Sequence, residues 1–172
     1  MQALKKLTEA ASIAGKELNK IGIEKSRPNE GGNAIELFVK NALNKIGCNA
    51  DSPSTSSGKK KAAGYPDLEF KDEFGRTNYL ECKTFNIKNI ATTQRSFYLS
   101  PSNDFKVTKD AHHFVISFEL YVAGRKGGDN IYKSRGWKIL SVEKLEVDVK
   151  YEFNSDNARM YTEKLILAEG KL

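Results

Sequence analysis

Features typical of secreted, membrane-spanning and zinc-binding proteins are scarce in this chain. Its 172 residues include only two cysteines, Cys48 and Cys82, which are too few for a disulfide framework and lack zinc-type spacing. No run of about 18 consecutive apolar residues occurs, so we expect no membrane span. The first seven residues lack a continuous apolar segment, so we expect no secretory signal. Together these absences favour a cytoplasmic protein with reduced, packed cysteines.

The composition is that of a folded, basic protein. Apolar residues make up 39% of the chain and aromatic residues 10%, which favours one globular domain over residues 1–172 and excludes a disordered chain. The formal net charge is +6. A positive balance of this kind favours a polyanionic partner such as DNA, because each phosphate neutralised by Lys or Arg releases a condensed counterion.

Two helices are expected at the N-terminal end, within residues 2–46. Apolar residues spaced by three and four predict a helix over residues 2–21, ended by Gly22, and a second over residues 33–46, ended by Gly47. The first pattern is also heptad-like, so a dimer seam is the alternative to core packing. We favour core packing because two seam positions are alanines, which bury little area.

Glu36 lies at the edge of the apolar face of the second expected helix. A capping box with Asn33 as the N-cap residue accounts for a glutamate at this position. That structural role does not exclude a catalytic one.

A serine-rich and lysine-rich loop is expected over residues 49–64. It contains the consecutive lysines Lys59, Lys60 and Lys61, and its composition is typical of a mobile loop. The loop is either a plain linker or a phosphate clamp that orders on DNA. We favour the clamp because the loop leads directly to Asp67.

The stretch over residues 66–86 predicts a β-hairpin that carries ionisable side chains. Two alternating runs, 66–70 and 79–85, flank a polar turn that contains Gly75. Alternation along the second strand places Glu81 and Lys83 on one face. If Asp67 opens the first strand on the same side, two acids and an ammonium converge. The alternative is a solvated hairpin with a cross-strand ion pair.

Residues 87–172 are expected to complete the sheet and read DNA. Strands are predicted over 95–100, 113–122, 131–140 and 160–167, while residues 142–149 suit either a helix or a strand. The adjacent His112 and His113 point to opposite faces of a strand and are expected to be surface or packing residues.

The converging groups suit phosphodiester hydrolysis. Hard divalent cations such as Mg²⁺ prefer carboxylate oxygens, which Asp67 and Glu81 would supply, with Mn²⁺ as an alternative ion. Such a metal stabilises charge on the phosphate and lowers the pKa of an attacking water. Lys83 is then expected to orient or deprotonate that water, or to stabilise the developing charge.

These residues resemble the PD-(D/E)xK nuclease superfamily. The motif is Pro66-Asp67, thirteen residues, then Glu81-Cys82-Lys83, and a preceding Gly-x-x-x-Glu element corresponds to Gly32 through Glu36. The resemblance covers about residues 30–86. It implies an α/β fold with a mixed β-sheet flanked by helices, a restriction-endonuclease-like core, Mg²⁺-dependent DNA cleavage, and Asp67, Glu81 and Lys83 as the catalytic set, with Glu36 assisting.

Within the superfamily, the order of helix, basic loop and strands also resembles archaeal-type Holliday junction resolvases. The long region after Lys83 favours a small type II restriction endonuclease instead. Gln94 and Tyr98 match a Gln-x-x-x-Tyr motif of recombination-type nucleases, but we expect Tyr98 in the core. A non-catalytic nucleic-acid-binding domain on the same fold is the remaining alternative.

Double-stranded DNA is the expected partner, bound by a homodimer because cutting both strands of a palindrome calls for two-fold symmetry. Basic side chains outside the lysine-rich loop are candidates for contacts to bases and phosphates. They are Arg95, Lys106, Lys109, Arg125, Lys126, Lys133 and Arg135.

Overall fold

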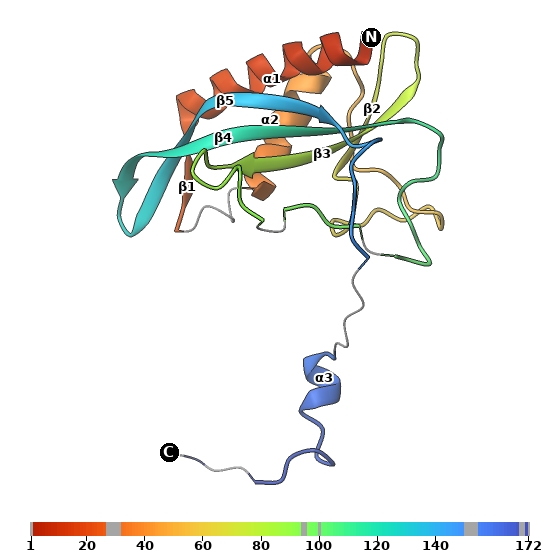
Figure 1. Ribbon diagram of the computed structural model, residues 1–172, viewed down its shortest axis with the longest axis vertical. Helices are drawn as coiled ribbons and strands as arrows, with labels where there is room; N and C mark the ends of the chain where they lie inside the picture. The colour runs from red at the N-terminus through yellow and green to blue at the C-terminus, as the bar shows by residue number, and fades with distance from the viewer. Residues whose placement is uncertain are drawn as a thin grey trace.

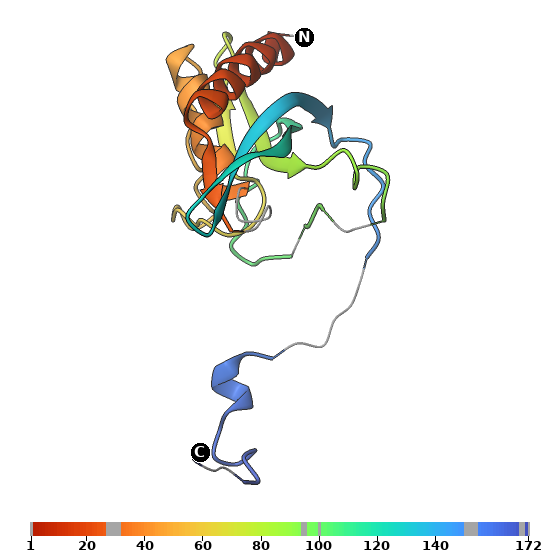
Figure 2. The ribbon, with the colours of Figure 1, turned by 90° about the vertical axis from the view of Figure 1, so that its left-hand side faces the viewer.

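A mixed β-sheet with helices against one face forms the body of the protein. The computed structural model describes residues 2–26, 32–93, 96–99, 101–149, 155–168 and 171. In this part of the chain the sheet has five strands in the order β1-β5-β4-β3-β2. Figure 1 shows α1 and α2 lying together along the sheet, and Figure 2 shows both on the same side of it. The expected α/β class is therefore confirmed.

The elements follow one another as a helix, a short strand, a second helix, a hairpin, a longer hairpin and a short helix. Their bounds are α1 Gln2–Ile21, β1 Ile23–Lys25, α2 Gly32–Lys45, β2 Leu68–Lys71, β3 Thr77–Phe85, β4 His112–Lys126, β5 Asp129–Ser141 and α3 Asn157–Met160. None of the described helices has the length and apolar character needed to cross a bilayer.

Helix α1 packs on the protein's own core, as the sequence favoured. Its buried residues include Leu7, Ala11, Ala14 and Leu18, four of the positions in the heptad-like pattern. The outermost pattern residue, Ile21, is 67% exposed. The helix ends where Gly22 adopts a φ of +79°, a conformation that glycine takes without strain.

Strand pairing leaves one edge of β3 open. β2 pairs antiparallel with Thr77–Leu80 only, whereas β3 continues to Phe85 and pairs parallel with β4 on its other side. The C-terminal half of β3 therefore has no β2 residues alongside it. Asp67 comes directly before β2, so it lies where this open edge begins.

The chain after β5 differs from the sequence-based expectation. Residues 160–167 are not a strand: Met160 ends α3, and Tyr161–Leu167 form turns and irregular structure. Residues 142–149 form neither a helix nor a strand, and residues 96–99 are likewise irregular. Both views place α3 away from the sheet (Figures 1 and 2). Residue pattern favoured strands here, but a strand forms only when a segment pairs with another, and these described residues join no strand of the sheet.

Candidate active site

Asp67 is held beside the open edge of β3 by a hydrogen bond from the backbone. Its Oδ2 accepts from the backbone N–H of Cys82 at 2.8 Å. Cys82 stands between Glu81 and Lys83, so this contact brings Asp67 next to both. The loop before β2 thus presents its carboxylate to the paired strand, in the geometry considered from the sequence.

Glu81 and Lys83 form a close pair on the same strand. The Lys83 Nζ donates to Glu81 Oε1 at 2.5 Å, and the Glu81 side chain is only 8% exposed. The other oxygen, Oε2, is buried and has no hydrogen-bond partner among the described residues. Burial, together with the nearby negative charge of Asp67, raises the pKa of Glu81. One carboxylate oxygen is therefore left available for a ligand.

Glu36 approaches this group from α2. Burial and the charge of Asp67 raise the pKa of Glu36, and Glu81 contributes in the same direction. Three carboxyl groups from α2, the β2 approach and β3 thus influence one another. The expected capping box is wrong in detail, because Asn33 lies within α2, which begins at Gly32.

Two of these three carboxyl groups lie at a cavity of about 650 Å³. Glu36, Asp67 and Lys83 line the cavity, whereas Glu81 is not part of its lining. Tyr98, which we expected in the core, is 52% exposed and also lines the cavity, so that expectation is wrong. The rest of the wall comes mainly from the end of β3, the following turn, the second half of β4 and the start of β5, and includes Thr84, Phe85, Asn86, Asn89, Tyr121 and Tyr132.

The donor set fits a hard cation that retains water ligands. No group of three or more His, Cys, Asp or Glu side chains in the described ranges is arranged to hold a metal ion by itself. Mg²⁺, however, is usually held by one or two carboxylates together with waters. Asp67 and the unpartnered oxygen of Glu81 match that requirement.

Lys106 differs most from its sequence-based expectation. Instead of lying on a DNA-facing surface it is 4% exposed, and its ammonium donates to the carbonyl oxygens of Gly64 at 2.7 Å and Pro66 at 3.1 Å. The prediction that it contacts DNA is therefore wrong, because the group that would do so is enclosed by the segment before Asp67. No local sequence signal marked this burial, because the neighbouring Phe105 is itself 50% exposed.

Comparison with known proteins places the chain in a family. The model of the Type II restriction enzyme MjaV family matches residues 1–164. The chain belongs to this family. One relative, the Type II restriction enzyme MjaV of Methanocaldococcus jannaschii, is 41% identical over 179 aligned positions, which cover 99% of this chain and 75% of the relative. The aligned region includes all four candidate catalytic residues.

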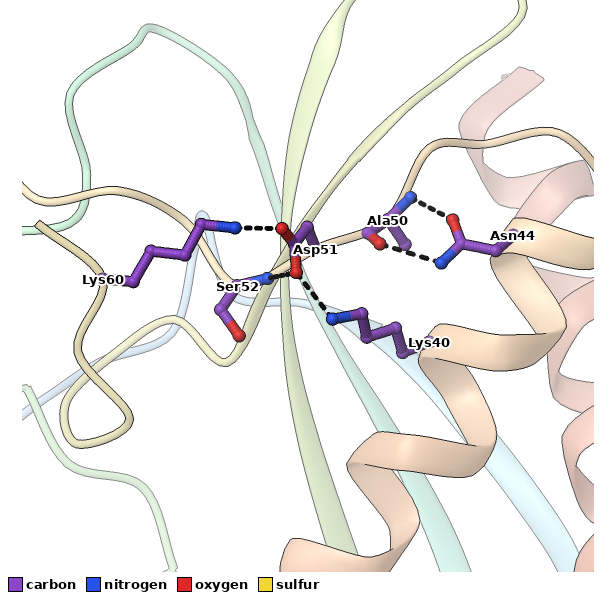
Figure 3. A network of polar contacts seen from close by, with 6 residues as sticks. All are labelled: Lys40, Asn44, Ala50, Asp51, Ser52 and Lys60. Carbon is purple, nitrogen blue, oxygen red and sulfur yellow. Dashed lines mark hydrogen bonds and ion pairs between the residues drawn. The ribbon is translucent and has the colours of Figure 1, made fainter. Parts of the chain in front are cut away.

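The basic loop of this family member is folded onto α2 and the 101–111 segment. Figure 3 shows Asp51 between Lys40, which donates at 2.6 Å, and Lys60, while the Asn44 side chain makes two hydrogen bonds to the backbone of Ala50. The two lysines hold the pKa of Asp51 well below its usual range. The structure therefore shows a loop tied down by polar contacts where composition predicted a mobile one.

Further contacts fix the tip of the loop. Lys61 pairs with Asp104 at 2.7 Å, and the Ser56 N–H donates to the Phe105 carbonyl oxygen at 2.8 Å. Lys59 has no ion pair among the described residues. Of the three loop lysines, Lys59 is thus the one without an acidic partner among the described residues.

The other candidate DNA contacts are spread over the sheet. Lys109 pairs with Glu69 at 3.0 Å, and Lys126 pairs with Glu24 at 2.9 Å. Arg135 lies over the ring of Tyr121, a cavity residue. Arg125 is exposed at the end of the β4–β5 hairpin and Lys133 is partly buried. Arg95, like Gln94, lies outside the described residues.

The two histidines occupy the packing and surface positions expected of them. His112 is exposed and pairs with Glu143 at 2.9 Å. His113 Nδ1 lies 2.7 Å from the Tyr65 hydroxyl, and its ring contacts the ring of Tyr79. Burial lowers the pKa of His113. His113 and Tyr65 therefore pack just before Pro66, a support that sequence reasoning did not identify.

Proposed function

We propose that this protein is a Mg²⁺-dependent type II restriction endonuclease of the PD-(D/E)xK superfamily that cleaves double-stranded DNA at a specific sequence. The observation that carries the proposal is the unpartnered buried oxygen of Glu81, flanked by Asp67 and Lys83 at a cavity. Membership of a restriction enzyme family supports the same conclusion.

Asp67 and Glu81 would hold Mg²⁺, with Mn²⁺ as an alternative ion. When bound, the metal neutralises charge on the phosphate and lowers the pKa of the attacking water. Asp67 is oriented for this task by the N–H of Cys82, and the partly exposed Lys83 reaches the cavity from the next position on β3.

Lys83 is the residue best placed to act on the water or on the developing negative charge. Its ammonium is 30% exposed and faces the cavity while it remains next to Glu81. A positive group in this position orients a nucleophile and stabilises an oxyanion. Glu36, which lines the same cavity, assists through the electrostatic balance of the acid cluster.

Double-strand cleavage of a symmetric site requires two active sites, so we propose that two copies of the protein act as a homodimer on one duplex. We place this activity in the cytoplasm, where the protein encounters its DNA substrate. Sedimentation of the protein with a short duplex that contains the site is expected to give two chains per duplex. A complex of one chain per duplex that still cuts both strands contradicts the dimer.

A digest of mixed plasmid DNA tests the proposal. The protein in Mg²⁺ is expected to give discrete bands on a gel, and EDTA in excess is expected to abolish them. A smear indicates a nuclease without sequence specificity, and cleavage confined to an added four-way junction indicates a junction resolvase. Intact DNA on all substrates, together with a salt-dependent gel shift, indicates a DNA-binding domain without catalysis.

A further inference from the structure

Lys106 is a buried cation next to the acid cluster. Its neighbours Phe105 and Val107 flank it on an irregular segment before β4, and its own side chain turns inward. A charged side chain that is almost fully buried is rare and costly unless its hydrogen bonds are satisfied. The hydrogen bonds of Lys106 therefore show what keeps its charge at this position.

The ammonium group is satisfied by the backbone that leads to Asp67. It donates to the carbonyl oxygens of Ala62 at 3.4 Å, Gly64 at 2.7 Å and Pro66 at 3.1 Å. An ammonium has three N–H donors, and here three alternate residues of one segment supply the acceptors. The segment therefore curves around Lys106 and ends with the residue that precedes Asp67.

The negative charges of three nearby acidic side chains favour the charged form of Lys106. Burial lowers the pKa of Lys106, whereas the charges of Asp67, Glu81 and Glu36 raise it. None of the three acids forms an ion pair with Lys106 within 4 Å among the described residues, so Lys106 takes up none of their carboxylate oxygens. Lys106 thus offsets repulsion between the acids without occupying their oxygens.

We infer that Lys106 is a positioning residue of the active site, which holds the 62–66 segment so that Asp67 meets the Cys82 N–H beside Glu81. This inference rests on the proposed function. Lys106 does not line the cavity, so it acts through Asp67 and not on the substrate. Removal of its charge and donors frees the Pro66 carbonyl and loosens the Asp67 carboxylate.

The test compares Lys106→Met with Lys106→Arg and with Lys16→Met, a control at an exposed position of α1. Because small displacements of a catalytic group cost about 100-fold in rate, Lys106→Met is expected to cleave about 100-fold more slowly. Its KM for DNA is expected to stay within about threefold of the wild-type value. Lys106→Arg, which keeps the charge and N–H donors, is expected to recover most of the rate, and Lys16→Met to match the wild type.

A second readout does not depend on cleavage. The Cys82 amide hydrogen is protected by Asp67, so its exchange with solvent reports where that carboxylate lies. Lys106→Met is expected to exchange this amide faster, while the other β3 amides keep wild-type rates. If Lys106→Met does not fold, Lys106→Gln takes its place with the same expectations, because its shorter side chain has no charge and only two N–H donors for the three carbonyl oxygens.

Wild-type cleavage by the folded Lys106→Met variant overturns the inference. Slow cleavage with unchanged Cys82 exchange also overturns it, because Asp67 is then correctly held. If the wild-type protein itself cuts no DNA, the proposed function fails, and the exchange of the Cys82 amide alone decides whether Lys106 positions Asp67.

Discussion

The buried carboxylate of Glu81 has a cost at the scale of a single residue. Its pKa is raised by burial and by Asp67, in excess of the lowering by Lys83. Folding therefore favours the protonated form, and the native state binds more protons than the unfolded state between the ordinary carboxyl pKa and the raised value. The free energy of unfolding of the metal-free protein accordingly falls as pH rises through that window.

Replacement of this carboxylate is expected to stabilise the metal-free protein. Glu81→Gln removes the buried charge, so its thermal midpoint is expected to exceed that of the wild type at pH 7 and to converge with it at pH values below about 4. Differential scanning calorimetry in EDTA across this range is the measurement. A Glu81→Gln variant that is less stable than the wild type at pH 7 contradicts the conclusion that the buried Glu81 carboxylate destabilises the metal-free protein.

Addition of Mg²⁺ is expected to reverse the order of the thermal midpoints, so that the wild type becomes more stable than Glu81→Gln. Mg²⁺ that binds only the folded state stabilises it by about 2.7 kcal/mol at 100 times its dissociation constant. The wild-type midpoint is therefore expected to rise with Mg²⁺, and the Glu81→Gln midpoint to stay constant. Asp148→Asn, at an exposed position that is not part of the cavity lining, is expected to respond as the wild type does.

Sequence reasoning grouped residues whose positions follow from local spacing. Glu81 and Lys83 alternate along one strand, Asp67 directly precedes the strand paired with it, and α2 brings Glu36 close enough to interact with both acids. Lys106 was misplaced because its burial depends on a segment some forty positions earlier in the chain, which no local pattern reveals. The support of Pro66 by Tyr65 and His113 was missed for the same reason.

At the scale of elements, the polar network between α2 and the basic loop anchors the approach to β2. The Asn44 side chain accepts from the Ala50 N–H at 2.6 Å and donates to the Ala50 carbonyl oxygen at 3.0 Å, as Figure 3 shows. Ala50 is 4% exposed, so its backbone groups have little access to water. The helix thereby fixes the start of the loop whose end carries Asp67.

Loss of this anchor is expected to cost stability. Asn44→Ala leaves both polar groups of Ala50 without a partner, which typically costs about 1–3 kcal/mol of unfolding free energy. Urea denaturation measures the change. Asn41→Ala, at an exposed position of the same helix, is the matched control and is expected to stay within about 0.5 kcal/mol of the wild type. Equal values for the two variants contradict the anchoring role.

Element prediction succeeded where periodicity was local and failed where pairing was distant. The 2–21 helix was predicted at its observed bounds, and the second helix and the hairpin within one or two residues. β1 has only three residues, Ile23–Lys25, too few for a pattern, and exists because it pairs with β5. The parallel pairing of β3 with β4 joins distant segments, so strand order was not available from the hairpin pattern.

At the scale of the whole molecule, the sheet order explains why the site lies where it does. β2 is short, so β3 emerges beyond it with an open edge, and α2 crosses nearby with Glu36 facing that edge. Helices occupy one face of the sheet (Figure 2). Acids from three elements thereby converge at one cavity in a protein whose net charge of +6 favours a polyanionic substrate.

Cleavage of a plasmid in Mg²⁺ by active-site variants tests the central claim most directly. The comparison sets Asp67→Asn and Lys83→Ala against the wild type and the exposed controls Asp148→Asn and Lys16→Ala. We expect the wild type and both controls to give the same discrete fragments. Both active-site variants are expected to leave the DNA intact while they still shift it on a gel. Wild-type fragments from folded Asp67→Asn and Lys83→Ala proteins contradict the account, because the cutting then occurs elsewhere.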